Sequence, residues 1–184
     1  MELKEVLGMF ARYVVLLFLG LFGIRLFYAV FSPLTAYPSY WLSNLVFGGA
    51  EFVPPNLILI GSLTIELIPA CIAGAAYYLL LILNLTTPMH VVKRIKSLAF
   101  LILTFLVINI MRIVTFIVIA SRGTQYFDAA HLGVWYFGST VMIVILWFVN
   151  VWVFNIRAIP VYTDFSNLIA EMTRKPKKRK KKRK

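Results

Sequence analysis

The sequence predicts an all-α polytopic membrane protein with about four transmembrane helices and both termini in the cytoplasm. The first observation is composition: hydrophobic residues make up 61% of the chain and charged residues 14%, against roughly 45–50% and about 25% in soluble domains. The second is the length of the apolar runs, because a spanning helix needs about 20 mostly apolar residues. Four runs approach or exceed that length: 13–31, 67–85, 98–120 and 132–154.

The first apolar run is followed by a long connection, residues 32–66, which contains no Lys or Arg. Four prolines interrupt it: Pro33, Pro38, Pro54 and Pro55. Its last part, residues 56–66, consists of two short β-rich runs on either side of Gly61-Ser62. This pattern predicts a short extracytoplasmic hairpin between the first and second helices. The same residues also allow a re-entrant segment or the start of a longer second helix.

The third observation is the placement of Lys and Arg, which are retained on the cytoplasmic side of a membrane. They lie before the first run, between the second and third, and after the fourth, at Lys4, Arg12, Lys93, Arg94, Lys96 and Arg157. The connections on the opposite face carry only Arg122. The chain is therefore expected to form one membrane-embedded domain over residues 1–160 and a cytoplasmic basic tail over residues 161–184, disordered from residue 174 onward.

The cysteine and histidine content excludes several classes of site. A single cysteine excludes an intramolecular disulfide and paired-thiol redox chemistry. The two histidines are far apart and have no nearby thiols, so neither a metal site nor a cofactor is predicted. The first apolar run lacks a small-residue cleavage site, so no cleavable signal peptide is expected.

Three residues in or beside the apolar runs are candidates for function, because ionisable groups in a bilayer are costly. Arg112 lies eight residues before Ala120, and hence roughly 12 Å below the outer end of the third run. Cys71 lies about one turn into the second run from its outer end, and His131 precedes the fourth run at its outer end. All three are therefore predicted in the outer half of the membrane.

Each of these residues also has a purely structural interpretation. A lone cysteine in an apolar helix is usually a small buried hydrophobe. A histidine close to Trp135 and Tyr136 can anchor the chain at the headgroups, and an intramembrane arginine can extend toward a phosphate or a carbonyl. Their common predicted depth favours one shared site.

Together, the three residue types supply the parts of a thiol-based acyl transfer. A thiolate is the nucleophile, an arginine offers a permanent charge and a fork of donors to an oxyanion, and a histidine takes and returns a proton near neutral pH. Asn109, three residues before Arg112 on the same helical side, could orient the guanidinium. Asp128 could hold the His131 tautomer, although it also suits a solvated loop. Arg25 could complete the site, contact an anionic lipid or simply extend to the headgroups.

Three segments carry a resemblance to a known family: Glu66-Leu67-Ile68-Pro69-Ala70-Cys71-Ile72-Ala73-Gly74, Asn109-Ile110-Met111-Arg112-Ile113 and His131-Leu132-Gly133. Together they resemble the exosortase/archaeosortase family of polytopic membrane proteins, over residues 61–138. The resemblance implies a membrane-embedded cysteine transpeptidase with the catalytic roles on Cys71, Arg112 and His131. Family members often have a small polar residue directly after the cysteine, where this chain has Ile72, and many have more helices.

The resemblance also implies substrates and a location. Enzymes of this family recognise a C-terminal sorting signal made of a short motif, a transmembrane helix and a basic cluster. They cleave near the motif through a thioester and transfer the new carboxyl end to an acceptor, in archaea a lipid. The implied partners are therefore membrane-anchored surface precursors and a membrane lipid. The implied location is the cell membrane of an archaeon, in a multi-pass protein with its site near the extracytoplasmic face.

The tail leaves a different function open. Ten of the last eleven residues are Lys or Arg, the exception being Pro176. This run could reinforce cytoplasmic retention, bind anionic headgroups or contact a polyanion, without a module for a specific nucleic acid. The alternative is therefore a non-enzymatic membrane adaptor that recruits a polyanion. A small transporter with an anion site at Arg25 and Arg112 is a third hypothesis, which the apolar inner halves of the predicted helices disfavour.

Overall fold

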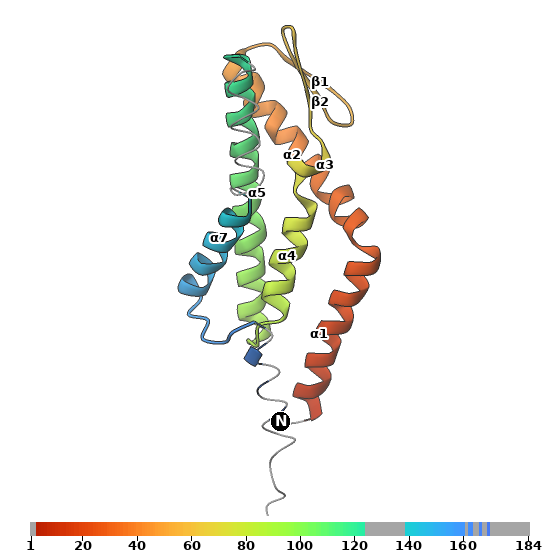
Figure 1. Cartoon of the computed structure of the whole chain (residues 1–184), viewed down its shortest axis with the longest axis vertical. Helices are drawn as coiled ribbons and strands as arrows, with labels where there is room; N and C mark the ends of the chain where they lie inside the picture. The colour runs from red at the N-terminus through yellow and green to blue at the C-terminus, as the bar shows by residue number, and fades with distance from the viewer. Residues whose placement is uncertain (1–2, 124–138, 161, 164–165, 167–168, 170–184) are drawn as a thin grey trace, which may run out of the picture.

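The computed structural model describes residues 3–123, 139–160, 162–163, 166 and 169. The elements follow in the order α1 (Leu3–Phe22), α2 (Ile24–Phe47), β1 (Ala50–Val53), β2 (Leu57–Ile60), β3 (Leu63–Glu66), α3 (Pro69–Ile72), α4 (Gly74–Leu85), α5 (Val91–Ser121) and α7 (Ser139–Val153). The prediction of an all-α fold is wrong, because three strands form an antiparallel sheet in the order β1-β2-β3. Figure 1 shows this sheet at the end of the molecule away from the N-terminus.

The hairpin predicted around Gly61-Ser62 is confirmed. β2 and β3 pair antiparallel on either side of this turn, and Gly61 has a φ of 59°, which glycine adopts without steric cost. β1, which the sequence did not predict, pairs with the other side of β2. Burial alternates along the strands, so that Ile58 is fully buried while Thr64 and Glu66 are exposed. Such alternation is typical of an antiparallel sheet with one face on the core and one face open.

The predicted first span, residues 13–31, is wrong because the helix breaks at Gly23. The break separates α1 from α2, and the two helices are bent by 76° relative to each other. Glycine permits the close approach of residue 23 to the Leu19 carbonyl oxygen, since a Cβ at Gly23 would overlap this oxygen.

The predicted connection after this span is also helical in its first half, because α2 continues through Pro33 and Pro38. A proline inside a helix costs about 3 kcal/mol or more, and that rule led to the prediction of a loop. α2 persists because it packs against α4 and α5 along a continuous buried face: Phe31, Thr35, Ala36, Ser39 and Ser43. Tertiary packing therefore outweighs the local preference.

The prediction of about four transmembrane helices is wrong, because most of the helices are too short or not apolar enough to cross a membrane. Among the described residues, only α5, with 31 residues, is long and apolar enough to cross a membrane by itself. α1 and α2 would add one span only if the bent pair crosses together, and the helical stretches Pro69–Leu85 and Thr140–Val153 are shorter than a spanning helix. α5 contains the predicted third span, and it supports association of the chain with a membrane.

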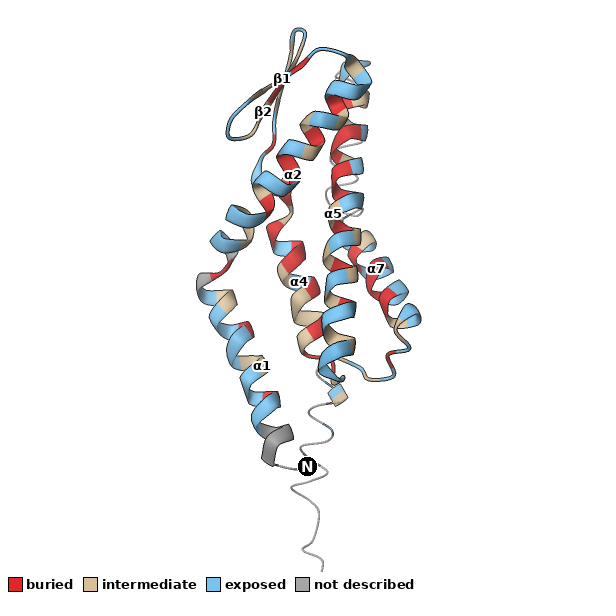
Figure 2. Ribbon diagram, turned by 180° about the vertical axis from the view of Figure 1, so that it is seen from behind, coloured by how far each residue is buried: buried red, intermediate tan, exposed pale blue. Residues whose placement is uncertain are grey.

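The core forms where α2, α4 and α5 meet. Tyr77 of α4 is fully buried there. Its ring stacks on Phe31 of α2 with 3.6 Å between centroids, and it meets Phe105 of α5 edge-on at 4.8 Å. Figure 2 shows buried residues on the facing sides of α2, α4 and α5, whereas α1 is largely exposed. The first turns of α4 are therefore fixed between the two longer helices.

A buried polar contact joins α4, α5 and α7. Asn84 Nδ2 donates to Ser97 Oγ at 2.9 Å, and Ser97 Oγ donates to Asn150 Oδ1 at 2.8 Å. All three side chains are fully buried. Hydrogen bonds between apolar helices stabilise their association where lipid and side chains are equally apolar.

Ser97→Ala is expected to lower the free energy of unfolding by about 1–3 kcal/mol, because it leaves two buried amide groups without their shared partner. Unfolding of the purified protein in detergent, followed by circular dichroism, measures the change. Ser121→Ala on the same helix is the matched control, since the Ser121 hydroxyl is exposed and bonds only its own helix, at the Val118 carbonyl. A similar effect of both substitutions would contradict a specific role for the buried contact.

At the C-terminal end of α4, two arginines contact its last carbonyls. Arg94 donates to the Asn84 and Leu85 carbonyl oxygens at 2.8 and 3.0 Å, and Arg12 donates to the Leu85 carbonyl oxygen at 3.1 Å. Cations at a helix C-terminus are stabilising because they oppose the helix dipole. Arg12 and Arg94 belong to two segments predicted on the same side of a membrane, and they meet at one end of the bundle.

Candidate functional site

Cys71 lies on a helical turn that is separated from the helix after it. α3 ends because Ala73 adopts the left-handed conformation, with φ 57° and ψ 38°. A residue other than glycine adopts this conformation rarely, and it turns the first amides of α4 away from α3. Within the described chain, the Ala70 and Cys71 carbonyls therefore receive no hydrogen bond from α4.

α5 supplies the missing partners of these two carbonyls. Asn109 Nδ2 donates to the Cys71 carbonyl oxygen at 2.9 Å, and Arg112 Nη2 lies 3.5 Å from the Ala70 carbonyl oxygen. Asn109 is fully buried, while Arg112 and the free thiol of Cys71 are half-buried. Two residues one helical turn apart on α5 thus hold the backbone around the thiol, and they bring a guanidinium next to it.

Three further polar side chains, buried on α2 and α4, were not predicted from the sequence. They are Thr35 and Ser39 of α2 and Tyr77 of α4, all fully buried. The Thr35 hydroxyl lies near the Tyr77 hydroxyl without reaching hydrogen-bond geometry. The signal in the sequence was the spacing of small hydroxyl residues at positions 35, 39 and 43 of an apolar stretch, which places them on one helical face.

The hydroxyl oxygens of Thr35, Ser39 and Tyr77, together with Asn109 Oδ1, have no hydrogen-bond partner among the described residues. A buried polar atom without a partner costs about 1–3 kcal/mol.

Comparisons with protein-family models, curated proteins and solved structures find no match to this chain.

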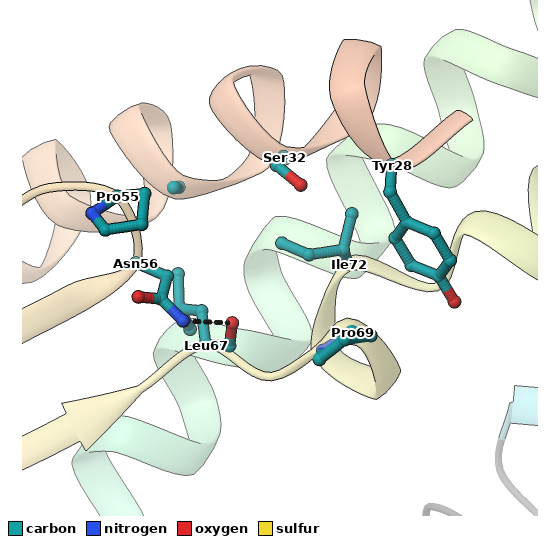
Figure 3. Close-up of a pocket in the computed structure, with 8 residues that line it drawn as sticks. Tyr28, Ser32, Pro55, Asn56, Leu67, Pro69 and Ile72 are labelled. Carbon is teal, nitrogen blue, oxygen red and sulfur yellow. Dashed lines mark hydrogen bonds between the residues drawn. The ribbon is translucent and has the colours of Figure 1, made fainter. Parts of the chain in front are cut away.

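A cavity of about 200 Å³ flanks α3. Its walls come from α2, from the β1–β2 turn and from the segment that leads into and through α3: Tyr28, Ser32, Ala36, Pro55, Asn56, Leu67, Pro69 and Ile72. Figure 3 shows the Ser32 hydroxyl and the Tyr28 ring on the α2 side, opposite Pro69 and Ile72. Asn56 Nδ2 donates to the Leu67 carbonyl oxygen at 3.3 Å and closes one end. An open space thus adjoins the short helix that carries the thiol.

The remaining predicted site residues are Arg25, which the structure describes, and His131 and Asp128, which it does not. Arg25 is exposed on the first turn of α2 and makes no hydrogen bond or ion pair with the described residues. His131, Asp128 and the basic run of the tail lie outside the described residues. Within the described ranges, no three His, Cys, Asp or Glu side chains are grouped so that they could hold a metal ion.

Proposed function

We propose that the chain is a membrane-embedded cysteine transpeptidase of the exosortase/archaeosortase type. The observation that supports this function is the contact of Asn109 and Arg112 with the backbone of Ala70 and Cys71. It sets a permanent positive charge beside the single thiol of the chain, on a turn that an unusual backbone conformation separates from α4. A thiolate is the nucleophile in such a reaction, and a neighbouring cation is one of the groups that stabilise it.

The proposed reaction has two steps. The Cys71 thiolate attacks a peptide carbonyl of the precursor, and the Arg112 guanidinium stabilises the negative charge that develops on the carbonyl oxygen. The C–N bond breaks, the leaving amine takes a proton from His131, and a thioester remains on Cys71. A hydroxyl or amine of the acceptor then gives its proton to His131 and attacks the thioester, which releases the thiolate.

The site is proposed to face the extracytoplasmic side. Arg94 and Arg112 both lie on α5 and are 18 residues apart, hence roughly 27 Å along the helix. The cluster around Arg12 and Arg94 therefore occupies the opposite end of the bundle from the thiol. Since Lys and Arg are retained in the cytoplasm, the thiol end points outward, where the C-terminal signals of surface precursors emerge from the membrane. A membrane lipid is the proposed acyl acceptor.

The thioester provides the direct test. The purified full-length chain, reconstituted in lipid nanodiscs with a precursor that carries a C-terminal helix and basic cluster, is expected to form a covalent adduct on Cys71. Intact-mass spectrometry should detect the adduct, and neutral hydroxylamine should remove it, because hydroxylamine cleaves thioesters. The Cys71→Ser variant is the control, since an ester formed by serine resists neutral hydroxylamine. Precursor cleavage without any adduct on the wild-type chain would contradict the thioester route.

A further inference from the structure

β3 is an edge strand that leads directly to the thiol. It ends at Glu66, and α3 begins at Pro69, so only Leu67 and Ile68 separate the strand from the turn that carries Cys71. β1, the other edge strand, follows α2 and packs against it through Phe52, whose ring lies 5.0 Å from that of Tyr37. Figure 1 shows the chain descending from the sheet into α3. Of the two edges, only the β3 edge is continuous with the site.

The pairing register fixes which backbone groups point away from the sheet. Next to a two-residue turn, the facing residues exchange both backbone hydrogen bonds, and the pattern then alternates along the strands. Leu63 and Ile65 therefore direct their N–H and C=O groups at β2, while Thr64 and Glu66 direct theirs at the open edge. The same alternation turns the Ala50 N–H outward on β1, where it donates to a side chain of α2 at 3.0 Å. This contact agrees with the register.

Most of the outward groups on β3 are available. The Glu66 carbonyl accepts a hydrogen bond from the Ile68 N–H at 3.1 Å. In the described part of the chain, the N–H and C=O of Thr64 and the N–H of Glu66 have no hydrogen-bond partner. Thr64, Glu66 and Ile68 are all exposed. An edge with unpaired N–H and C=O groups is a template for another extended chain.

We propose that the β3 edge binds the main chain of the precursor as a fourth strand and leads its scissile carbonyl to Cys71. The proposal rests on the function proposed above and names the binding mode of its substrate. The segment bound is the extended stretch on the N-terminal side of the scissile bond. It runs parallel to β3, because its C-terminal anchor continues into the membrane beyond Cys71 while its N-terminal part lies outside.

The charges around the edge restrict which precursors fit. The chain has no Lys or Arg between Arg25 and Lys93. The exposed face of the sheet carries two carboxylates, Glu51 and Glu66. Acidic side chains on that face of the added strand are repelled, and neutral or basic ones are accepted. The edge therefore recognises the main chain of the precursor, since alternating donors and acceptors pair with any extended backbone. The two carboxylates add a selection against acidic side chains.

Thr64→Pro tests the edge, with Thr64→Val as the matched control. Proline removes the outward N–H and leaves the β2–β3 hydrogen bonds, and it is tolerated on edge strands when its N–H side faces solvent. Valine keeps the N–H and the branched shape. With precursor and chain reconstituted in nanodiscs, the rate of cleavage is expected to fall at least about tenfold for Thr64→Pro and to stay within about twofold for Thr64→Val.

A crosslinking experiment tests the same proposal if the Thr64→Pro variant does not fold. In the Cys71→Ala background, a benzoylphenylalanine at position 64 is expected to capture the precursor, whereas the same group at position 51, two strands away, does not. No capture at position 64, or unchanged cleavage by a folded Thr64→Pro, overturns the edge proposal. If Cys71→Ala still cleaves the precursor, the transpeptidase function fails, and the edge proposal fails with it.

Discussion

Cys71→Ala and Cys71→Ser are expected to reduce precursor processing by at least about 10³-fold while the protein remains folded. Alanine lacks a nucleophile, and serine is a weak one at its ordinary pKa without dedicated activation. The thiol is half-buried against the core cluster, and alanine and serine replace it with side chains of similar or smaller size. Processing is measured by the C-terminal mass of surface precursors in cells that express each variant, and folding by thermal unfolding of the purified protein.

A double variant provides the control for the position of the thiol. Cys71→Ala with Ala75→Cys moves the only thiol four residues along the chain, to an exposed position on α4. It keeps the total thiol content, and it is expected to be as inactive as Cys71→Ala alone. Normal processing by the single Cys71→Ala variant would exclude a cysteine transpeptidase altogether.

Arg112→Lys is expected to reduce processing by about 10²–10³-fold, which is the usual effect of removing one donor to a developing oxyanion. Lysine keeps the charge but lacks the planar fork that can hold the Ala70 carbonyl and a substrate oxygen together. Rates of precursor cleavage in nanodiscs measure the effect. Arg122→Lys, at an exposed position just after the same helix, is the matched control and should change little.

Asn109→Ala distinguishes the contribution of the α5 contacts to stability from the contribution of the Arg112 guanidinium to the reaction. It leaves the Cys71 carbonyl without its partner, so it is expected to lower the free energy of unfolding by about 1–3 kcal/mol. It retains the guanidinium, so its effect on the cleavage rate should be smaller than that of Arg112→Lys. A rate within about twofold of wild type for Arg112→Lys would mean that the guanidinium only satisfies a carbonyl.

The sequence located the candidate site better than it located the helices around it. Counting residues inward from charged flanks predicts a common depth for Cys71 and Arg112. In the structure, Asn109 and Arg112 of α5 contact the Cys71 and Ala70 carbonyls. The hairpin at Gly61-Ser62 could be predicted because a two-residue turn depends mainly on the residues of the turn itself.

The predictions of the fold are wrong where tertiary packing outweighs the local preferences of the sequence. The prolines of α2 indicated a connection, yet the helix continues because its buried face packs on α4 and α5. The breaks at Gly23 and Ala73 divide two apolar runs that looked continuous. No local pattern distinguishes Ala73 from the alanines of α4. Thr35, Ser39 and Tyr77 were overlooked because hydroxyl groups in an apolar stretch carry little signal until their neighbours are known.

The break at Ala73 also determines when the site can exist during synthesis of the chain. The two carbonyls around the thiol are held by residues 38 and 42 positions further along, so the turn cannot acquire its final geometry before α5 has been made and packed. Until then, the sulfur lies on a short apolar segment with no guanidinium beside it. A nascent or truncated chain that ends before α5 therefore lacks both side chains that hold these two carbonyls.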